Sequence, residues 1–105
     1  MQPAIDRARL KDIFGDDETS IASTLKLASG VFSALNIALN EASSPEAAIA
    51  SAHELKGAAV NVGAMQLHEL SQEIESRLQS GDSLEAVRPL FGHVSAAVDC
   101  FKRQI

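Results

Sequence analysis

Hydrophobic residues between positions 21 and 42 recur at alternating spacings of four and three, which is typical of a helix with one side buried in a bundle. This stripe consists of Ile21, Leu25, Ala28, Phe32, Leu35, Leu39 and Ala42. We expect Leu27, Val31 and Ala38, on its flank, to widen the buried face. Ile37 lies nearly opposite the stripe and is expected to be exposed.

Helix-start and helix-stop residues divide the chain into five expected helices. Starts are marked by Asp16 or Asp17 as an N-cap and by Ser44 before Pro45 at the first helical position. Stops are marked by the glycines Gly15, Gly63 and Gly81. We therefore expect helices over residues 3 to about 14, 17 to 42, 45 to 62, 64 to 80 and 83 to 104.

The remaining helices also have one hydrophobic face each. The core face of the fourth is expected to contain Leu67, Leu70, Ile74 and Leu78, with Glu69, Glu73, Glu75 and Arg77 off it. The stripe of the last is Val87, Leu90, Phe91, Val94, Val98, Phe101 and Ile105. Pro89 should kink that helix near residues 85–89. The first helix should be pinned over one end by Ile5, Ile13 and Phe14.

Short loops between long amphipathic helices imply antiparallel neighbours, so we predict an all-α fold, an antiparallel up-down four-helix bundle with a short additional N-terminal helix. A length of 105 residues fits a single domain over residues 1–105. The chain is 46% hydrophobic but has only four aromatic residues, which favours packed helices over strands.

Composition also excludes several classes of function. The net charge of −5 and the lack of a basic stripe argue against nucleic-acid binding. We see no apolar run near the ~20 residues that span a bilayer, and no signal peptide. The one cysteine, Cys100, fits a reducing compartment and is expected to be a buried or half-buried filler in the last helix. We expect a soluble, cytoplasmic protein without membrane contact.

The third helix contains the residues with the clearest chemistry. Its buried stripe is expected to be Ala48, Ala52, Leu55, Ala59 and Val62. His53 lies roughly 150° from the centre of that stripe and should point outward, with Lys56 and Gly57 one turn further along its face. A helical glycine costs roughly 0.5–1 kcal/mol, and Gly57 would offset that cost by giving a second molecule access to the imidazole. This arrangement suggests a histidine that exchanges an anionic group with another protein.

The run His53-x-Leu55-Lys56-Gly57, followed by small residues and Gly63, resembles the signature of histidine-containing phosphotransfer (HPt) domains. The resemblance implies that His53 accepts and donates a phosphoryl group in a two-component phosphorelay. It implies receiver domains of response regulators or hybrid histidine kinases as partners, with the Mg²⁺ bound to the receiver and no cofactor in this chain. Lys56 would offer its charge to the phosphoryl oxygens.

The outward face of the third helix and the remaining histidines offer further candidate residues. Ile49 and Val60 share the outward face with His53 and are candidates for docking a partner, unless the first helix partly buries them. His68 and His93 lack a lysine–glycine neighbour and are expected to be solvated. The chain has no Glu-x-x-His pair for a di-iron site, no second zinc ligand after His53 and no nucleotide-binding glycine loop. We therefore expect a monomeric phosphocarrier without kinase activity of its own.

Two alternatives stay open on the sequence alone. One is a binding module of the same fold that sequesters a response regulator without relay. The other is a fragment of a dimeric histidine kinase, whose bundle would assemble from two chains. Phosphotransfer from a labelled receiver distinguishes the first alternative, and the mass of the particle in solution distinguishes the second.

Overall fold

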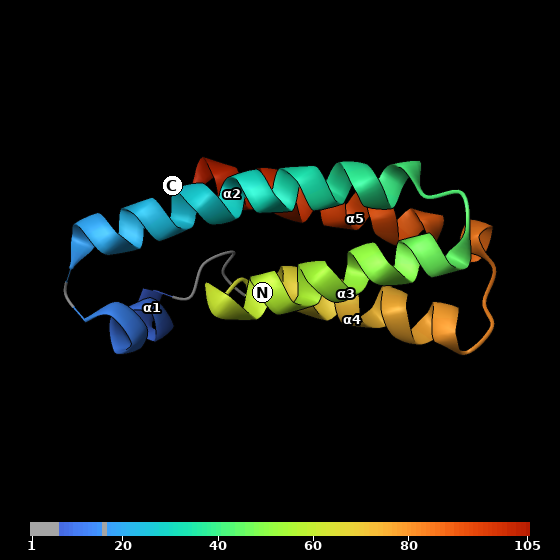
Figure 1. The fold of residues 1–105 in the computed structure, drawn as a ribbon, viewed down its shortest axis with the longest axis horizontal. Coiled ribbons are helices and arrows are strands. Elements are labelled where there is room, and N and C mark those ends of the chain that lie inside the picture. Colours follow the sequence, from blue (N-terminus) through green and yellow to red (C-terminus); the bar gives the residue numbers. More distant parts are fainter. Residues whose placement is uncertain (1–6, 16) are drawn as a thin grey trace.

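The computed structural model describes residues 7–15 and 17–105, and all regular secondary structure in these residues is helical. The helices are α1 (Arg7–Phe14), α2 (Glu18–Glu41), α3 (Pro45–Asn61), α4 (Met65–Gln79) and α5 (Leu84–Arg103). The four long helices run antiparallel to their neighbours along a body of 44 × 21 × 20 Å (Figure 1). Both the all-α class and the antiparallel four-helix bundle are confirmed.

Capping residues explain where the helices begin. The Asp17 carboxylate accepts hydrogen bonds from the backbone N–H groups of Thr19 and Ser20 at the start of α2. Ser44 accepts from Ala47 N at the start of α3, where Pro45 occupies the first turn, and Ser83 caps α5 in the same way. Each satisfies an N–H group that has no partner inside its helix. The predicted Ser44–Pro45 start is therefore confirmed.

Glycines in the left-handed conformation stand where three helices end. Gly15, Gly63 and Gly81 have φ values of 67°, 70° and 100°. This region is open to glycine because it has no Cβ to clash with the backbone. Gly63 ends the helix that contains His53, as the sequence predicts.

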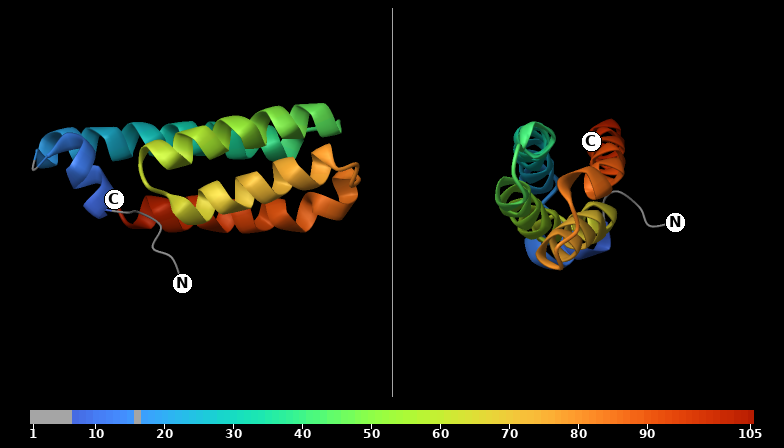
Figure 2. Two further views of the ribbon diagram at one scale, coloured as in Figure 1. Left: turned by 90° about the horizontal axis from the view of Figure 1, so that it is seen from below. Right: turned by 90° about the vertical axis from the view of Figure 1, so that its right-hand side faces the viewer.

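Each long helix packs mainly against two of the other three, so that α2 and α4 both lie between α3 and α5 (Figure 2). The core inside this ring includes two aromatic rings, Phe32 of α2 and Phe101 of α5, with centroids 4.9 Å apart at 76°. This edge-to-face arrangement is favourable for aromatic pairs. The completely buried residues also include Leu39, Ala48, Ala52, Leu55, Ala59, Ile74, Val87 and Val94.

The predicted width of the α2 stripe is wrong. Leu27 and Val31 were expected to be buried but are 73% and 46% exposed, and Ala38 is exposed too. They lie about 80–120° from the buried stripe of α2. Within the described chain α2 packs mainly against α3 and α5, and neither of them covers that flank. Ile37 is exposed as predicted, whereas Ile105, predicted to be in the α5 stripe, is also exposed.

The short first helix packs against α2, below its N-terminal end in Figure 1. Its anchor among the described side chains is Leu10, which is completely buried. Of the predicted anchors, Ile5 lies outside the described residues, and the side chains of Ile13 and Phe14 lie outside what the structure describes. In α5 the helix continues through Pro89, and the kink expected there stays a prediction.

One expectation about membranes has to be corrected. By length and composition alone, α2 is apolar enough to cross a bilayer, the one such helix found in the described part of the chain. Core helices of soluble proteins also meet this criterion. In this fold α2 buries Ile21, Leu25, Phe32 and Leu39 against the rest of the bundle, but only 22% of its apolar stretch is buried, so packing accounts for part of its apolar character.

Candidate functional site

His53 projects from the middle of α3 on the side away from the core. Ala48, Ala52, Leu55 and Ala59 occupy the buried face of that helix, and the His53 side chain is 68% exposed. The α3 sequence alone determines this orientation, because the stripe of small residues fixes which side packs. The imidazole is thus open to a second molecule, as predicted.

A buried carboxylate from α4 holds one edge of this imidazole. Glu75 Oε2 lies 2.8 Å from His53 Nδ1, and Glu75 Oε1 lies 2.5 Å from Lys56 Nζ. Glu75 itself is only 6% exposed. One carboxylate therefore joins the histidine and the lysine of α3, and all three side chains belong to one hydrogen-bonded group.

The sequence-based position of Glu75 is wrong. It was expected off the core face of α4, with Glu69, Glu73 and Arg77. Instead it lies on the flank of α4 that packs against α3, next to the buried Ile74. Its hydrogen bonds with His53 and Lys56 make this burial possible, because a buried charge needs hydrogen-bonded partners of opposite charge. The only signal in the sequence was a glutamate adjacent to the core stripe.

The environment keeps Glu75 ionised. The hydrogen bond from Lys56 is the largest influence and lowers the pKa of Glu75 below its ordinary 4.5, helped by His53 and opposed by burial. An ionised carboxylate can only accept hydrogen bonds. His53 Nδ1 must therefore bear a proton in this contact, which in the neutral imidazole leaves Nε2 as the nitrogen with the lone pair. Such a carboxylate partner fixes both the tautomer and the ring orientation of a histidine.

Lys56 and Gly57 complete the site. The Lys56 side chain is 22% exposed, because its ammonium group reaches back to Glu75 rather than out to solvent. An ammonium group has three donors, so this contact leaves capacity for phosphoryl oxygens. Gly57 is exposed, and a Cβ built on it would meet nothing within 4 Å. No packing contact in the part of the chain that the structure describes explains this glycine.

This geometry can be set beside known proteins. Residues 20–102 match the family of the Hpt domain. The chain belongs to that family. Membership implies a role in histidine phosphotransfer within a phosphorelay, which is the role of an intracellular signalling protein. Hpt domains interact with receiver domains in such relays. No curated protein and no solved structure matches the chain.

The other two histidines of the Hpt domain differ from each other. His93 is exposed, as predicted. His68 is half-buried, with Nδ1 3.4 Å from the carbonyl oxygen of Lys56, so the expectation that it is solvated is wrong. It lies one turn into α4, where the helix passes α3. His68 thus has a structural contact next to the site, while its position does not expose it as His53 is exposed.

The two predicted docking residues are only partly available. Ile49 and Val60 are both half-buried, and Ile49 packs against the core. Each still presents part of its side chain near His53, and their docking role stays a prediction. Cys100, predicted to be a buried or half-buried filler of α5, is half-buried and packs against the core.

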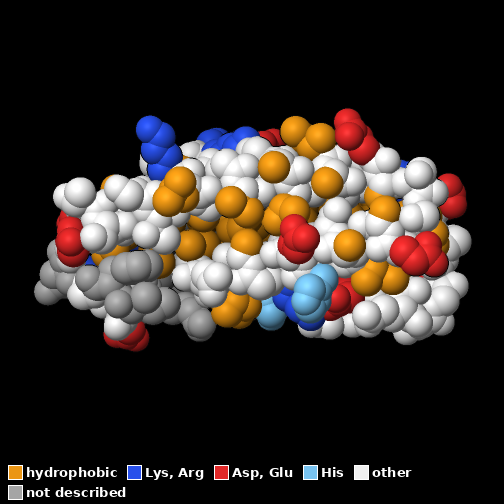
Figure 3. Space-filling model, in the orientation of Figure 1, with side chains coloured by type: hydrophobic (Ala, Val, Ile, Leu, Met, Phe, Trp, Pro, Cys, Tyr) orange, Lys and Arg blue, Asp and Glu red, His pale blue; other side chains and the backbone are white. Residues whose placement is uncertain are grey.

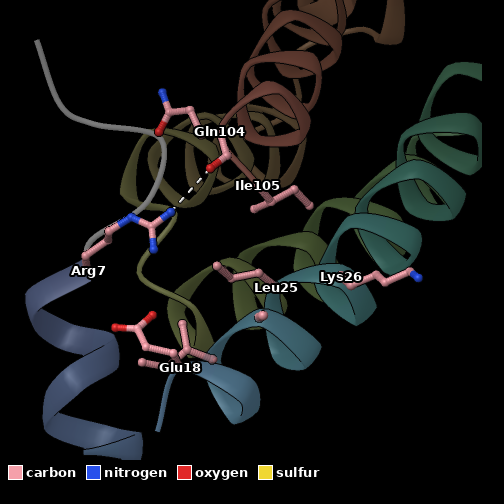
Figure 4. Close-up of a pocket in the computed structure, with 8 residues that line it drawn as sticks. Arg7, Glu18, Leu25, Lys26, Gln104 and Ile105 are labelled. Atoms are coloured by element: carbon pink, nitrogen blue, oxygen red, sulfur yellow. Dashed lines mark hydrogen bonds between the residues drawn. The ribbon is translucent and has the colours of Figure 1, made fainter. Parts of the chain in front are cut away.

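No further chemistry is evident in the part of the chain that the structure describes. Within residues 7–15 and 17–105, no three His, Cys, Asp or Glu side chains come together to hold a metal ion. A hollow of about 330 Å³ lies between α1, the start of α2 and the end of α5 (Figure 4). Its walls are mostly apolar, and Arg7 closes one side by donating to the carbonyl oxygen of Gln104. None of its lining residues belongs to the His53 group.

Replacing Glu75 should change how the stability of the Hpt domain depends on pH. A carboxylate whose pKa is lowered by folding stabilises the fold above its ordinary pKa of 4.5, and this stabilisation is lost as pH falls through the lower folded value. Glu75→Gln should therefore cost about 1–3 kcal/mol at pH 7, with a smaller cost near pH 3. Urea unfolding of both proteins across this range measures the difference. Asp17, whose pKa is also lowered, is present in both proteins, so its contribution to the pH dependence does not affect the difference between them. An equal difference at every pH would contradict this role.

Proposed function

We propose that this Hpt domain accepts a phosphoryl group on His53 from an aspartyl phosphate of one receiver domain and passes it to an aspartate of another. The observation that best supports this is the hydrogen bond from His53 Nδ1 to the buried Glu75 carboxylate. It orients an exposed imidazole with Nε2 outward and the proton on the opposite nitrogen. A nucleophile oriented in this way by a second group is typical of covalent catalysis.

The transfer step follows from this geometry. The Nε2 lone pair attacks the phosphorus, the bond to the aspartyl oxygen breaks, and that oxygen leaves as a carboxylate. The imidazole then has a phosphoryl group on Nε2 and a proton on Nδ1, so the ring bears a positive charge. Glu75 stabilises this charge without taking the proton, since it is an ionised acceptor held by Lys56. The reverse step delivers the group to the next receiver.

The receiver supplies what this chain does not provide. Phosphoryl transfer depends mainly on positioning and on neutralising the charge of the phosphoryl oxygens. Lys56 contributes one positive charge, and we propose that the receiver brings the Mg²⁺ with its own aspartate. We further propose that the protein works as a monomer in the cytoplasm, since one chain already contains the histidine, its carboxylate partner and the lysine.

A panel of phosphorylated receiver domains tests the proposal. Receivers encoded in the same genome are labelled with radioactive phosphate and mixed with the Hpt domain. At least one should transfer its label, and the product should be acid-labile and alkali-stable, as a phosphohistidine is. Binding of a receiver without transfer would indicate a sequestering module instead. Light scattering should give about one chain mass, and two would favour the fragment of a dimeric kinase.

Lys56 is expected to matter for rate more than for binding. Its Nζ is hydrogen-bonded to Glu75, the carboxylate that also contacts His53 Nδ1, so we expect its charge to act on that carboxylate and on the phosphoryl group. Lys56→Ala should slow single-turnover transfer about tenfold, because the transition state loses about the free energy of one hydrogen bond to a charged group. Receiver affinity should be nearly unchanged. Lys56→Arg, which keeps the charge, should recover part of the rate. An unchanged rate in Lys56→Ala would make the lysine structural only.

A further inference from the structure

Ser71 of α4 is buried without a hydrogen-bond partner. Its side chain is completely buried, and its Oγ makes no hydrogen bond within the part of the chain that the structure describes. A helical serine can donate to the carbonyl oxygen four residues earlier, which here belongs to Leu67, but Ser71 does not. A hydroxyl in this state costs stability, because it has lost its hydrogen bonds to water without replacing them. Its place on the buried face of α4 therefore needs an explanation.

This hydroxyl lies one turn from the carboxylate that holds His53. Ser71 and Glu75 are four residues apart on α4 and both belong to its buried side, so their Cβ atoms are about 5–6 Å apart. A long side chain on a helix extends toward the N-terminus, over the residue one turn earlier. For Glu75 that residue is Ser71. Because a hydroxyl hydrogen rotates to suit an acceptor, Ser71 is a buried donor next to the Glu75 carboxylate.

The lysine that now occupies this carboxylate has two roles that compete. Lys56 donates to Glu75 Oε1, while His53 Nδ1 contacts Oε2. In the proposed transfer Lys56 also neutralises the phosphoryl oxygens. These oxygens are attached through Nε2, at the edge of the imidazole opposite to Nδ1 and Glu75. As Lys56 turns toward them, its hydrogen bond to Glu75 weakens.

A buried carboxylate needs a replacement for a partner that leaves. Glu75 is only 6% exposed, so solvent has little access to it. The hydrogen bond from Lys56 is the largest cause of the low pKa of Glu75, and burial alone raises that pKa. A carboxyl group that takes up a proton no longer balances the positive charge of the phosphorylated ring. The site therefore requires a second donor when Lys56 engages the phosphoryl group.

We infer that Ser71 is this donor, and that its hydroxyl donates to Glu75 Oε1 when Lys56 moves to the phosphoryl oxygens. This rests on the proposed function, because the phosphoryl group is what draws Lys56 away. Only hydrogen bonds change in this step, and no proton is transferred. Ser71 acts through Glu75 and is a positioning residue. Its hydroxyl has no partner in the unphosphorylated protein because Lys56 then holds that oxygen.

The burial of Ser71 separates this role from receiver contact. Histidine side chains appear at the surface over α3 and α4, with basic and acidic side chains beside them (Figure 3). Ser71 does not belong to this surface, because it is completely buried. A change at Ser71 therefore leaves the surface that a receiver meets as it is, and any effect on transfer has to pass through the interior of the bundle.

A double-mutant cycle on the unphosphorylated protein tests the role without a receiver. Ser71→Ala removes an unpartnered hydroxyl and introduces a better helix former, so it should raise the melting temperature by a few degrees. Lys56→Ala frees Glu75 Oε1, and Ser71 should then donate to it. In the Lys56→Ala background, Ser71→Ala should therefore lower the melting temperature by a few degrees. This reversal of sign measures the coupling between the two residues.

Ser95→Ala is the control for the cycle. Ser95 is a half-buried serine of α5 whose hydroxyl lies 3.0 Å from Asn36 Oδ1 of α2. It belongs to the contact between α2 and α5 and makes no hydrogen bond with the His53 group. Its loss should lower the melting temperature by the same amount with and without Lys56.

Transfer kinetics test Ser71 in the working protein. With a receiver that labels wild-type His53, Ser71→Ala should lower the maximal single-turnover rate about tenfold, the effect of one hydrogen bond to a charged group. The half-saturating receiver concentration should stay within about twofold, since no receiver contact is removed. The variant should thus be more stable than the wild type and slower. A serine with only a packing role would change the melting temperature and leave both kinetic constants unchanged.

Two results would overturn this role of Ser71 and leave the proposed function intact. One is an additive cycle, in which Ser71→Ala shifts the melting temperature in the same direction with and without Lys56. The other is a normal maximal transfer rate in Ser71→Ala. If no receiver labels the wild type, the proposed function fails, and the exchange of partners on Glu75 during transfer fails with it.

Discussion

His53→Gln is expected to abolish phosphorylation by every receiver that labels the wild-type protein. The change removes Nε2, the nitrogen that the Glu75 contact leaves as the nucleophile. The fold should survive, because the His53 side chain is mostly exposed. The amide of glutamine can also donate to Glu75, which retains Lys56 as its main partner. Circular dichroism and autoradiography of the same sample measure the two effects.

The other two histidines provide the controls for this experiment. His93→Gln changes an exposed residue and should retain full labelling and stability. His68→Gln removes a contact to the carbonyl oxygen of Lys56, so a small loss of stability is expected, with labelling retained. If label persists in His53→Gln, the phosphorylated residue is another one and the central proposal is wrong.

Features determined by short stretches of chain were predictable from the sequence. The Asp17 and Ser44 caps and the ends at Gly15 and Gly63 depend on residues within one turn of each other. The outward direction of His53 likewise follows from the pattern of α3 alone. These predictions required no knowledge of which helices lie side by side.

Features that depend on the arrangement of the helices were missed. Glu75 is next to the α4 core stripe, and only the packing of α4 against α3 brings it to His53 and Lys56, 22 and 19 positions earlier. The predicted burial of Leu27 and Val31 was wrong for a related reason. An apolar residue on the flank of a stripe is buried only if another helix covers that flank. Hydrophobic periodicity gives the direction of the core but not its width, which the number of neighbouring helices decides.

At Gly57 stability and transfer are expected to respond in opposite directions. The position is exposed, and a Cβ would meet nothing within 4 Å. Gly57→Ala should therefore stabilise the protein by roughly 0.5–1 kcal/mol, mainly by reducing the freedom of the unfolded chain. Glutamine, a good helix former, should be tolerated equally well. The melting temperature of both variants should rise by a few degrees.

Transfer should become slower in the same variants. Gly57 lies one turn beyond His53 on the same face of α3. Any side chain there occupies the space that an approaching receiver needs and crowds the phosphoryl group on Nε2. Gly57→Ala should slow single-turnover transfer a few-fold, and Gly57→Gln by about 100-fold or more, because small misplacements of reacting groups are costly.

Gly92 supplies the matched control for this last experiment. It is an exposed helical glycine of α5 with nothing within 4 Å of its Cβ position, and α5 does not contribute to the His53 group. Gly92→Ala and Gly92→Gln should raise the melting temperature as the Gly57 variants do, while transfer stays normal. If the Gly57 variants are less stable than the wild type, the glycine has a packing role after all. If they are more stable and transfer at the normal rate, receiver access does not explain Gly57, even with His53 as the phosphorylated residue.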